Sequence, residues 1–206
     1  MSGAFPISSA KFETLGIKSI QNTIISKSVS GKKLARQIDN QRFGFTVRIV
    51  TGTRSDVYGE LMAFIIKQRS GKENFTIIPP EIEDARGNES GTVLVNGVHA
   101  VGDTTIAVDG HANNNPNAFK AGDFIKFASH SKVYMIVADV QASSNASTLT
   151  IEPPLLTALA DDSAVTYDNV PFTVHLTNDI QEFGAVGTAK DGAFLYQFEF
   201  DVEETL

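Results

Sequence analysis

Residues 42–80 constrain the fold most, because they read without a gap as a strand, a helix and a second strand. The first part alternates polar residues with Phe43, Phe45, Val47 and Ile49, which is the period of a half-buried strand. The next part places on one helical stripe Val57, Leu61, Phe64, Ile65 and Gln68. Ser55 and Asp56 offer a helix N-cap, and Gly71 stands where a left-handed residue would end the helix. The unit carries no reactive group, so we expect it to serve packing.

The end of the sequence predicts another long strand. Over residues 194–202, one face carries Phe194, Tyr196, Phe198, Phe200 and Val202. Burial of each such aromatic side chain contributes roughly 1.5–3 kcal/mol, so we expect this terminus to be docked in a core. Residues 172–177 alternate in the same way, and Asp191 with Gly192 predicts a turn before the last strand.

The middle of the chain differs in composition and in the length of its apolar runs. Residues 81–90 are charged and poor in apolar residues, which is typical of a linker. Short β-like runs then follow at 93–95, 104–108, 123–127, 133–140, 148–151 and 164–167. Stretches rich in Asn, Ser and Pro separate these runs. Short strands at this regular spacing predict a small OB-like β-barrel.

These patterns together predict a mainly β protein with two domains. Residues 1–88 and 169–206 would form a discontinuous β-sandwich domain with one packed α-helix, and residues 89–168 would form an inserted OB-like β-barrel. Within the first domain, residues 7–29 favour one or two strands with turns at Gly16 and Asn22. Residues 28–40 are polar and basic, and we interpret them as a hairpin arm or a surface loop.

Composition excludes several function classes. The absence of cysteine excludes disulfides, thiolate nucleophiles and cysteine-ligated metal sites. Residues 1–89 carry 13 basic and 9 acidic side chains, residues 90–168 carry 3 and 8, and residues 169–206 carry 1 and 7. A basic N-terminal part and an acidic remainder of the chain favour self-association over specific nucleic-acid binding. The alternative is a solvated surface with an uneven charge distribution. We find no run that predicts a signal peptide or membrane insertion.

Catalytic and metal-binding patterns are not found. The four histidines, His99, His111, His130 and His175, lack metal-ligand spacing, and we expect each at the surface or in a loop. Residues 109–113 partly match a calcium loop, but Lys120 stands where the bidentate Glu would be needed. No phosphate loop or nucleophile elbow is present. We therefore predict no catalytic residue, no metal, no cofactor and no enzymatic activity.

A ligand face on the barrel is one hypothesis. Phe124, Phe127, Lys132 and Tyr134, with Phe119 nearby, lie in or beside the predicted barrel strands. OB-like barrels use aromatic side chains to stack sugars or bases. The acidic charge of this region leaves a host-surface glycan as the ligand class. The alternative interpretation is that these aromatics fill the barrel interior.

The chain resembles the distal tail protein of long flexible-tailed (siphovirus) bacteriophages, of the two-domain type with an OB-like barrel. Three stretches carry the resemblance: residues 68–79, where a glycine and a strand into proline follow the helix; residues 121–134, including the histidine before Lys-Val-Tyr; and residues 170–206. Residues 7–40 match the family poorly.

The resemblance implies a structural virion protein of the tail tip, assembled in the host cytoplasm. Six copies would form a ring that connects the tail tube protein to the baseplate hub or tail fibre protein and lets DNA pass. Acidic walls would keep DNA from adhering, so Glu199 and Asp201 are candidate lumen residues. The family supplies no catalytic residues. The alternative function is a carbohydrate-binding module used in host attachment, followed by a tail tube subunit and then a hydrolase.

Overall fold

The computed structural model describes residues 3–7, 11–80, 82–112 and 114–206. Parts of the stretch expected to form the first strand, of the expected linker and of the calcium-like loop lie outside the described residues. The chain divides into two compact units. The first contains residues 6–75 and 174–205, the second contains residues 3–5 and 76–173, and each is described by itself.

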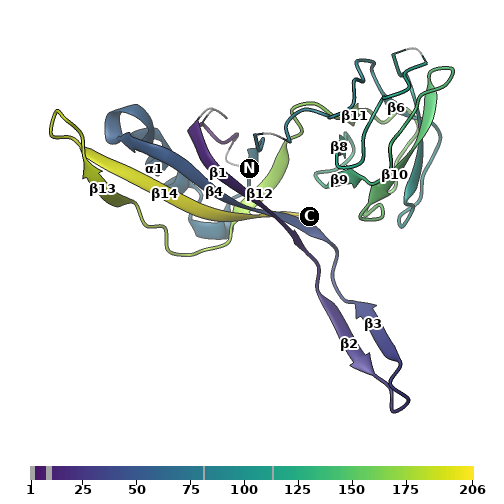
Figure 1. The fold of residues 1–206 in the computed structure, drawn as a ribbon, viewed down its shortest axis with the longest axis horizontal. Helices are drawn as coiled ribbons and strands as arrows, with labels where there is room; N and C mark the ends of the chain where they lie inside the picture. The colour runs from purple at the N-terminus through teal and green to yellow at the C-terminus, as the bar shows by residue number, and fades with distance from the viewer. Residues whose placement is uncertain (1–2, 8–10, 81, 113) are drawn as a thin grey trace. The chain divides into compact units, whose positions relative to one another are not determined.

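The first unit is built on a six-stranded sheet (Figure 1). Its strands are β1 (Phe12–Ile20), β4 (Arg42–Thr53), β5 (Phe75–Ile77), β12 (Phe172–Leu176), β13 (Gly184–Thr188) and β14 (Phe194–Glu204). The order across the sheet is β1-β4-β14-β12-β5, and β13 also pairs with β14. The long strand β4 lies antiparallel to both β1 and β14, so early and late segments of the chain share one sheet.

The two long strands bury the residues that their alternation predicted. Phe45, Val47 and Ile49 of β4 have no exposed surface, and Phe198 and Phe200 of β14 are 1% and 2% exposed. The prediction fails at the start of β14, where Phe194 is 62% exposed. This end of β14 pairs with β13, all of whose residues are exposed, so no core lies beneath it.

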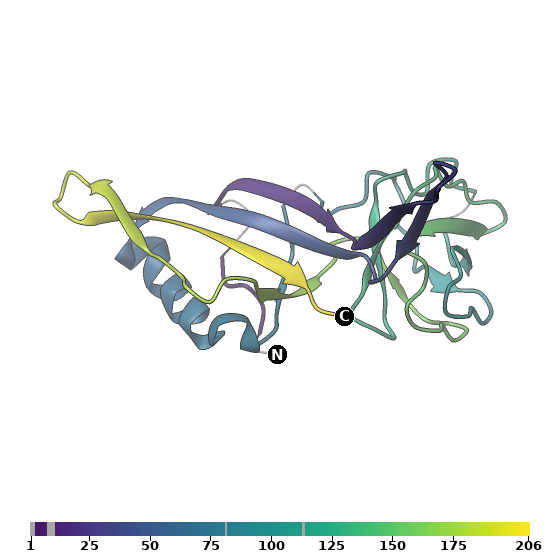
Figure 2. The ribbon, with the colours of Figure 1, turned by 90° about the horizontal axis from the view of Figure 1, so that it is seen from below.

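One helical segment covers the apolar face of the sheet (Figure 2). It begins as a π-helical turn, η2 (Arg54–Tyr58), continues as α1 (Gly59–Lys67) and is followed by a short 3₁₀ turn, η3 (Ser70–Lys72). Leu61 and Ile65 are buried against the sheet. The ring of Phe64 meets the ring of Phe75 edge-on, with centroids 5.2 Å apart. The predicted strand-helix-strand unit is therefore present.

Both predicted ends of the helix differ from the observed ones. Thr53 is the N-cap residue in place of Ser55 or Asp56, and its side chain makes no capping bond. The left-handed backbone falls on Arg69, with φ of 52°, whereas Gly71 lies in η3. Gly71 serves close packing, because a Cβ there would lie 2.5 Å from the carbonyl oxygen of Leu176.

The hydroxyl of Tyr58 fills a gap between β4 and β14. Val50 and Thr51 of β4 lie opposite the single residue Gln197 of β14, so the ladder is bulged here. The hydroxyl accepts a hydrogen bond from the backbone N–H of Phe198 at 3.0 Å and donates to the Val50 carbonyl at 3.1 Å. Burial raises the pKa of the Tyr58 phenol. The side chain therefore ties the helix to both long strands.

A separate hairpin leaves the sheet between β1 and β4. It consists of β2 (Thr23–Lys27) and β3 (Lys33–Gln37), which pair only with each other among the described residues. The hairpin overlaps residues 28–40, which were predicted to be a hairpin arm or a surface loop. The turn predicted at Asn22 is wrong, because the Asn22 carbonyl accepts a hydrogen bond from the Ile38 N–H at 3.0 Å and the chain runs on from β1 into β2. The turn predicted at Gly16 is wrong, because Gly16 lies within β1 opposite Thr46.

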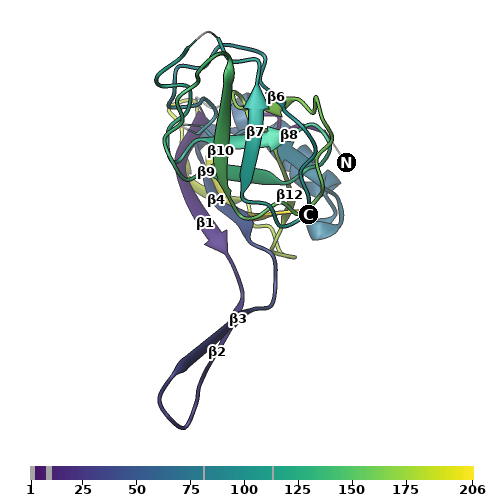
Figure 3. The same cartoon turned by 90° about the vertical axis from the view of Figure 1, so that its right-hand side faces the viewer.

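The second unit contains a six-stranded antiparallel barrel (Figure 3). Its strands are β6 (Leu94–Val95), β7 (Thr105–Asp109), β8 (Phe124–Phe127), β9 (Val133–Ile136), β10 (Ala146–Glu152) and β11 (Val165–Thr166). The strand order is β11-β8-β9-β10-β7-β6. A hydrogen bond of 3.0 Å from the Val165 N–H to the Val93 carbonyl and a bridge between Leu94 and Ala164 nearly close the barrel. The predicted fold class is confirmed: the chain is mainly β, with one packed α-helix and a small barrel.

Replacing Tyr58→Phe should lower the free energy of unfolding by about 1–3 kcal/mol, because the N–H of Phe198 loses its partner inside the core. Calorimetry of the full chain measures this loss, and amide hydrogen exchange at Phe198 should accelerate. Tyr196→Phe is the matched control, because the Tyr196 hydroxyl makes no hydrogen bond among the described residues. This change should alter stability by less than about 0.5 kcal/mol. Unchanged exchange at Phe198 in the Tyr58 variant would contradict this role.

Candidate functional site

The polar face of the six-stranded sheet carries charges from β1, β4 and β14. Arg48 is the centre of one network: its Nε lies 3.2 Å from Oε2 of Glu13, and its Nη2 donates to Oε1 of Gln197 at 2.6 Å. Gln197 in turn donates to the Glu13 carboxylate at 2.8 Å. Opposite charges are thereby matched across three neighbouring strands of one chain.

The two candidate lumen residues lie on this face and differ in their partners. Asp201 accepts hydrogen bonds from the Lys18 ammonium at 2.6 Å and from the Thr46 hydroxyl at 2.5 Å. Lys18, and then Thr46, lower the pKa of the Asp201 carboxyl. Glu199 is exposed and forms no ion pair among the described residues. Of the two carboxylates, only Glu199 therefore presents an uncompensated negative charge.

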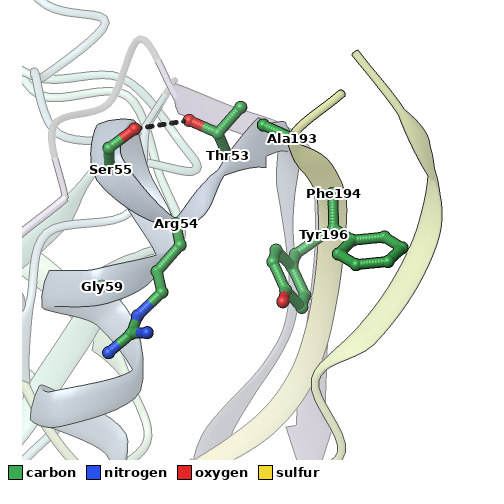
Figure 4. A pocket seen from close by; sticks show the side chains of 7 residues that line it. All are labelled: Thr53, Arg54, Ser55, Gly59, Ala193, Phe194 and Tyr196. Carbon is green, nitrogen blue, oxygen red and sulfur yellow. Dashed lines mark hydrogen bonds between the residues drawn. The ribbon is translucent and has the colours of Figure 1, made fainter. Parts of the chain in front are cut away.

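An open pocket of about 400 Å³ lies where β4 passes into the helix (Figure 4). Its lining comprises Thr53, Arg54, Ser55, Gly59, Ala193, Phe194 and Tyr196. The hydroxyls of Thr53 and Ser55 are 3.1 Å apart and satisfy each other. The exposed guanidinium of Arg54 has no partner among the described residues. A guanidinium beside the exposed ring of Phe194 and the half-buried Tyr196 suits contact with an acidic, partly apolar protein surface.

The predicted ligand-face residues of the barrel are buried. Phe124 is 5% exposed, Lys132 is 2% exposed, and Phe127 and Tyr134 have no exposed surface. Phe119, named with them, is also fully buried. In this structure the aromatic side chains fill the interior, which the alternative interpretation expected. Binding of a glycan by the barrel stays a prediction.

Tyr134 has a structural partner on each side of its hydroxyl. The hydroxyl lies 2.8 Å from Nε2 of His130 and accepts a hydrogen bond from the backbone N–H of Leu156 at 3.1 Å. Burial, and then the charges of Lys126 and Lys132, lower the pKa of His130. The hydroxyl therefore connects the strand β9 to the loop that follows β10.

A buried cluster of polar side chains in the barrel was missed by the sequence analysis. The ring of His111 is 3% exposed: its Nδ1 lies 2.8 Å from Oε2 of Glu89, and its Nε2 lies 2.7 Å from Oγ of Ser147. The other oxygen of Glu89 accepts hydrogen bonds from the backbone N–H groups of Ser90, Gly91 and Ala112 at 2.7–2.9 Å. This saturated carboxylate joins the start of the barrel unit to the loop after β7, which indicates a structural role.

These hydrogen bonds control the ionisation of Glu89. Burial raises the pKa of its carboxyl, but the bonds from Ala112, His111, Gly91 and Ser90 outweigh burial and lower the pKa to about 2. The carboxylate is therefore charged at all physiological pH values.

A second buried carboxylate holds the same segment. Asp123, 2% exposed, accepts hydrogen bonds from the backbone N–H groups of Arg86 at 2.8 Å, Gly87 at 3.3 Å and Lys120 at 2.7 Å. Gly87 has no room for a side chain, because a Cβ would lie 2.1 Å from the Ala118 carbonyl oxygen. The expected free linker is therefore wrong over residues 86–89, which are bonded to the barrel.

Across residues 3–7, 11–80, 82–112 and 114–206, no group of three or more His, Asp or Glu side chains could hold a metal ion. In the same residues, no helix is long and apolar enough to cross a membrane.

The comparisons with known proteins bear on the barrel unit. Residues 82–170 match the family model described as "Distal tail protein pb9, B domain". The chain carries a distal tail protein B domain. The resemblance to a phage distal tail protein is thereby confirmed for the barrel unit, and a structural role in a phage tail follows. No curated protein matches the chain.

The B domain match includes the segment that Glu89 and Asp123 hold. The barrel unit thus begins before β6, with residues whose charge and glycine content looked like a linker. Sequence patterns gave no signal for this, because both carboxylates act on backbone amides that are distant in the chain.

Replacing Glu89→Gln should weaken the barrel and reduce its acid sensitivity. The folded pKa of about 2 lies below the ordinary value of 4.5. The carboxylate therefore contributes stability above about pH 4.5, on the order of 3 kcal/mol, and this contribution disappears as the pH falls toward 2.

Hydrogen exchange of β7 and β10 in the full chain, measured between pH 3 and 7, reports this local stability. The exposed residue Glu152 provides the control, because Glu152→Gln should leave the pH dependence of the wild type intact. A Glu89 variant with the same pH dependence as the wild type would refute the proposed linkage.

Proposed function

We propose that this chain forms a hexameric ring at the tip of a siphovirus tail, where it connects the tail tube to the baseplate hub and fibre and lets DNA pass. The distal tail protein B domain at residues 82–170 is the observation that carries the proposal. The proposed partners are further copies of the chain, the tail tube protein and a hub or fibre protein. The chain would be located at the tail tip of the virion.

The six-stranded sheet supports self-association. Among the described residues, β1 pairs only with β4, and β13 pairs only with β14, so each leaves an unpaired strand edge. Natural proteins cover such edges or close them against another strand. A head-to-tail contact repeated around a ring covers the edges of every copy.

Glu199 and Asp201 are proposed to line the passage. Both belong to the polar face of the sheet, and Glu199 keeps a free negative charge that repels DNA phosphates. Lys18 compensates the charge of Asp201, so Glu199 supplies the main acidic contribution.

Native mass spectrometry and negative-stain electron microscopy at increasing protein concentration test the ring. The expected result is a closed species of six copies that grows at the expense of the monomer. A monomer at every concentration would contradict the proposal. A ring with Glu199 on its outer perimeter would remove the lumen assignment and leave the ring intact.

We also propose that the barrel is a domain inserted into the sheet unit, with residues 89–168 as its core. The segments that lead into and out of it lie together: the Asn169 N–H donates to the Glu83 carbonyl at 2.5 Å, and the Ala85 N–H donates to the Asp168 carboxylate at 3.2 Å. Adjacent ends are a property of tolerated domain insertions.

Removal of residues 84–168, with a Gly-Gly bridge between the ends, should therefore leave a folded sheet unit. Circular dichroism and a cooperative thermal transition measure this, because the buried faces of β4 and β14 remain complete. Removal of residues 43–57 is the control and should abolish folding. A shortened chain without a cooperative transition would contradict the insertion.

A further inference from the structure

The hairpin of β2 and β3, which we name the arm (residues 23–37), has no supporting surface among the residues that the structure describes. Every residue of both strands is exposed. Figure 1 shows the arm extending beyond the ends of β1 and β4. An isolated two-stranded hairpin is at best marginally stable in water. The arm therefore requires a surface on another molecule to be fixed.

The side chains of the arm define the chemistry of that surface. Ile24, Ile25 and Leu34 are 52–57% exposed. The arm also carries four basic residues and no acidic one: Lys27, Lys32, Lys33 and Arg36. None of the four forms an ion pair among the described residues. The complementary surface is thus acidic and partly apolar.

The segment that leads into and includes β13 (residues 178–188) has this complementary character. Asp179 and Glu182 are exposed and form no ion pair among the described residues. Ile180 and Val186 are 77% and 57% exposed. The outer edge of β13 is unpaired, since β13 contacts only β14 in the described sheet.

The register of the sheet places the arm and β13 at opposite ends of β14. The arm joins β1 and β4 where Ile20 lies opposite Arg42, beside the end of β14 near Glu203. The strand β13 pairs with the other end of β14, with Thr188 opposite Phe194. The arm and β13 itself of one copy are therefore separated by the length of the long strands, whereas residues 178–183 lead to β13 from Thr177, whose N–H donates to the Asp201 carbonyl.

We propose that the arm of one copy docks along residues 178–188 of the next copy. The inference rests on the proposed ring and names its contact. Two different surfaces meet in a head-to-tail arrangement, which is the contact type that closes into rings. Basic residues of the arm face Asp179 and Glu182, and the aliphatic side chains of both segments cover each other. Because both surfaces belong to the sheet unit, the contact does not involve the barrel.

Disulfide cross-linking tests this contact, and the cysteine-free chain provides a clean background. One preparation of the full chain carries Ala35→Cys in the arm, and a second, size-tagged preparation carries Ala185→Cys in β13. Oxidation of the mixture should give at least tenfold more mixed dimer than a control mixture. In the control, the size-tagged preparation carries Ala63→Cys, at an exposed alanine on α1, in place of Ala185→Cys. Equal yields in the two mixtures would overturn the proposal.

Charge reversal provides an independent check on the same cross-link. Lys33→Glu with Arg36→Glu in the arm preparation should reduce the yield at least tenfold. Asp179→Lys with Glu182→Lys in the partner preparation should restore it. All four positions are exposed, and restoration shows that the altered chains are folded. A cross-link yield that stays the same after these charge reversals would overturn the proposed docking.

Electron microscopy of the same samples separates this inference from the proposed function. Closed rings without the specific cross-link would sustain the ring and refute the arm contact. Cross-linked open chains without closed rings would sustain the arm contact and refute the ring.

Discussion

The hydroxyl of Tyr58 is the interaction on which the sheet unit depends. It bridges β4 and β14 where their ladder is interrupted, and it belongs to the segment that covers the apolar face. On one side of the bulge, β14 buries Phe198 and Phe200. On the other side, β14 leaves the core and pairs with the exposed strand β13. A single buried hydroxyl thus marks the boundary between the part of the sheet that stabilises the subunit and the part that is free for contacts.

The barrel unit is organised by buried carboxylates in place of a helix. Glu89 and Asp123 each accept several backbone hydrogen bonds, and both hold the segment that precedes β6. Charged hydrogen bonds of this kind are stronger than neutral ones and have a fixed geometry. The two carboxylates therefore fix the segment that leads into the barrel, and the chain enters and leaves the barrel side by side through Glu83 and Asn169.

The sequence predicted what depends on local period and missed what depends on distant partners. Alternation in β4 and β14 and the spacing of the helix were sufficient, because a face of a strand or helix is a local property. Glycines were ambiguous: Gly16 lies within a strand, and Gly71 admits a carbonyl from a strand about a hundred residues later. The burial of His111 and the hydrogen bonds of Glu89 could not be predicted either, because their partners are distant along the sequence.

The exposed arm has a consequence for the subunit before assembly. Its four Lys and Arg residues are exposed. Trypsin-like proteases cleave after such residues when the backbone around them opens readily. If the arm docks on a neighbouring copy as proposed, an unassembled subunit exposes a cleavage site that assembly conceals, and limited digestion distinguishes free copies from incorporated ones.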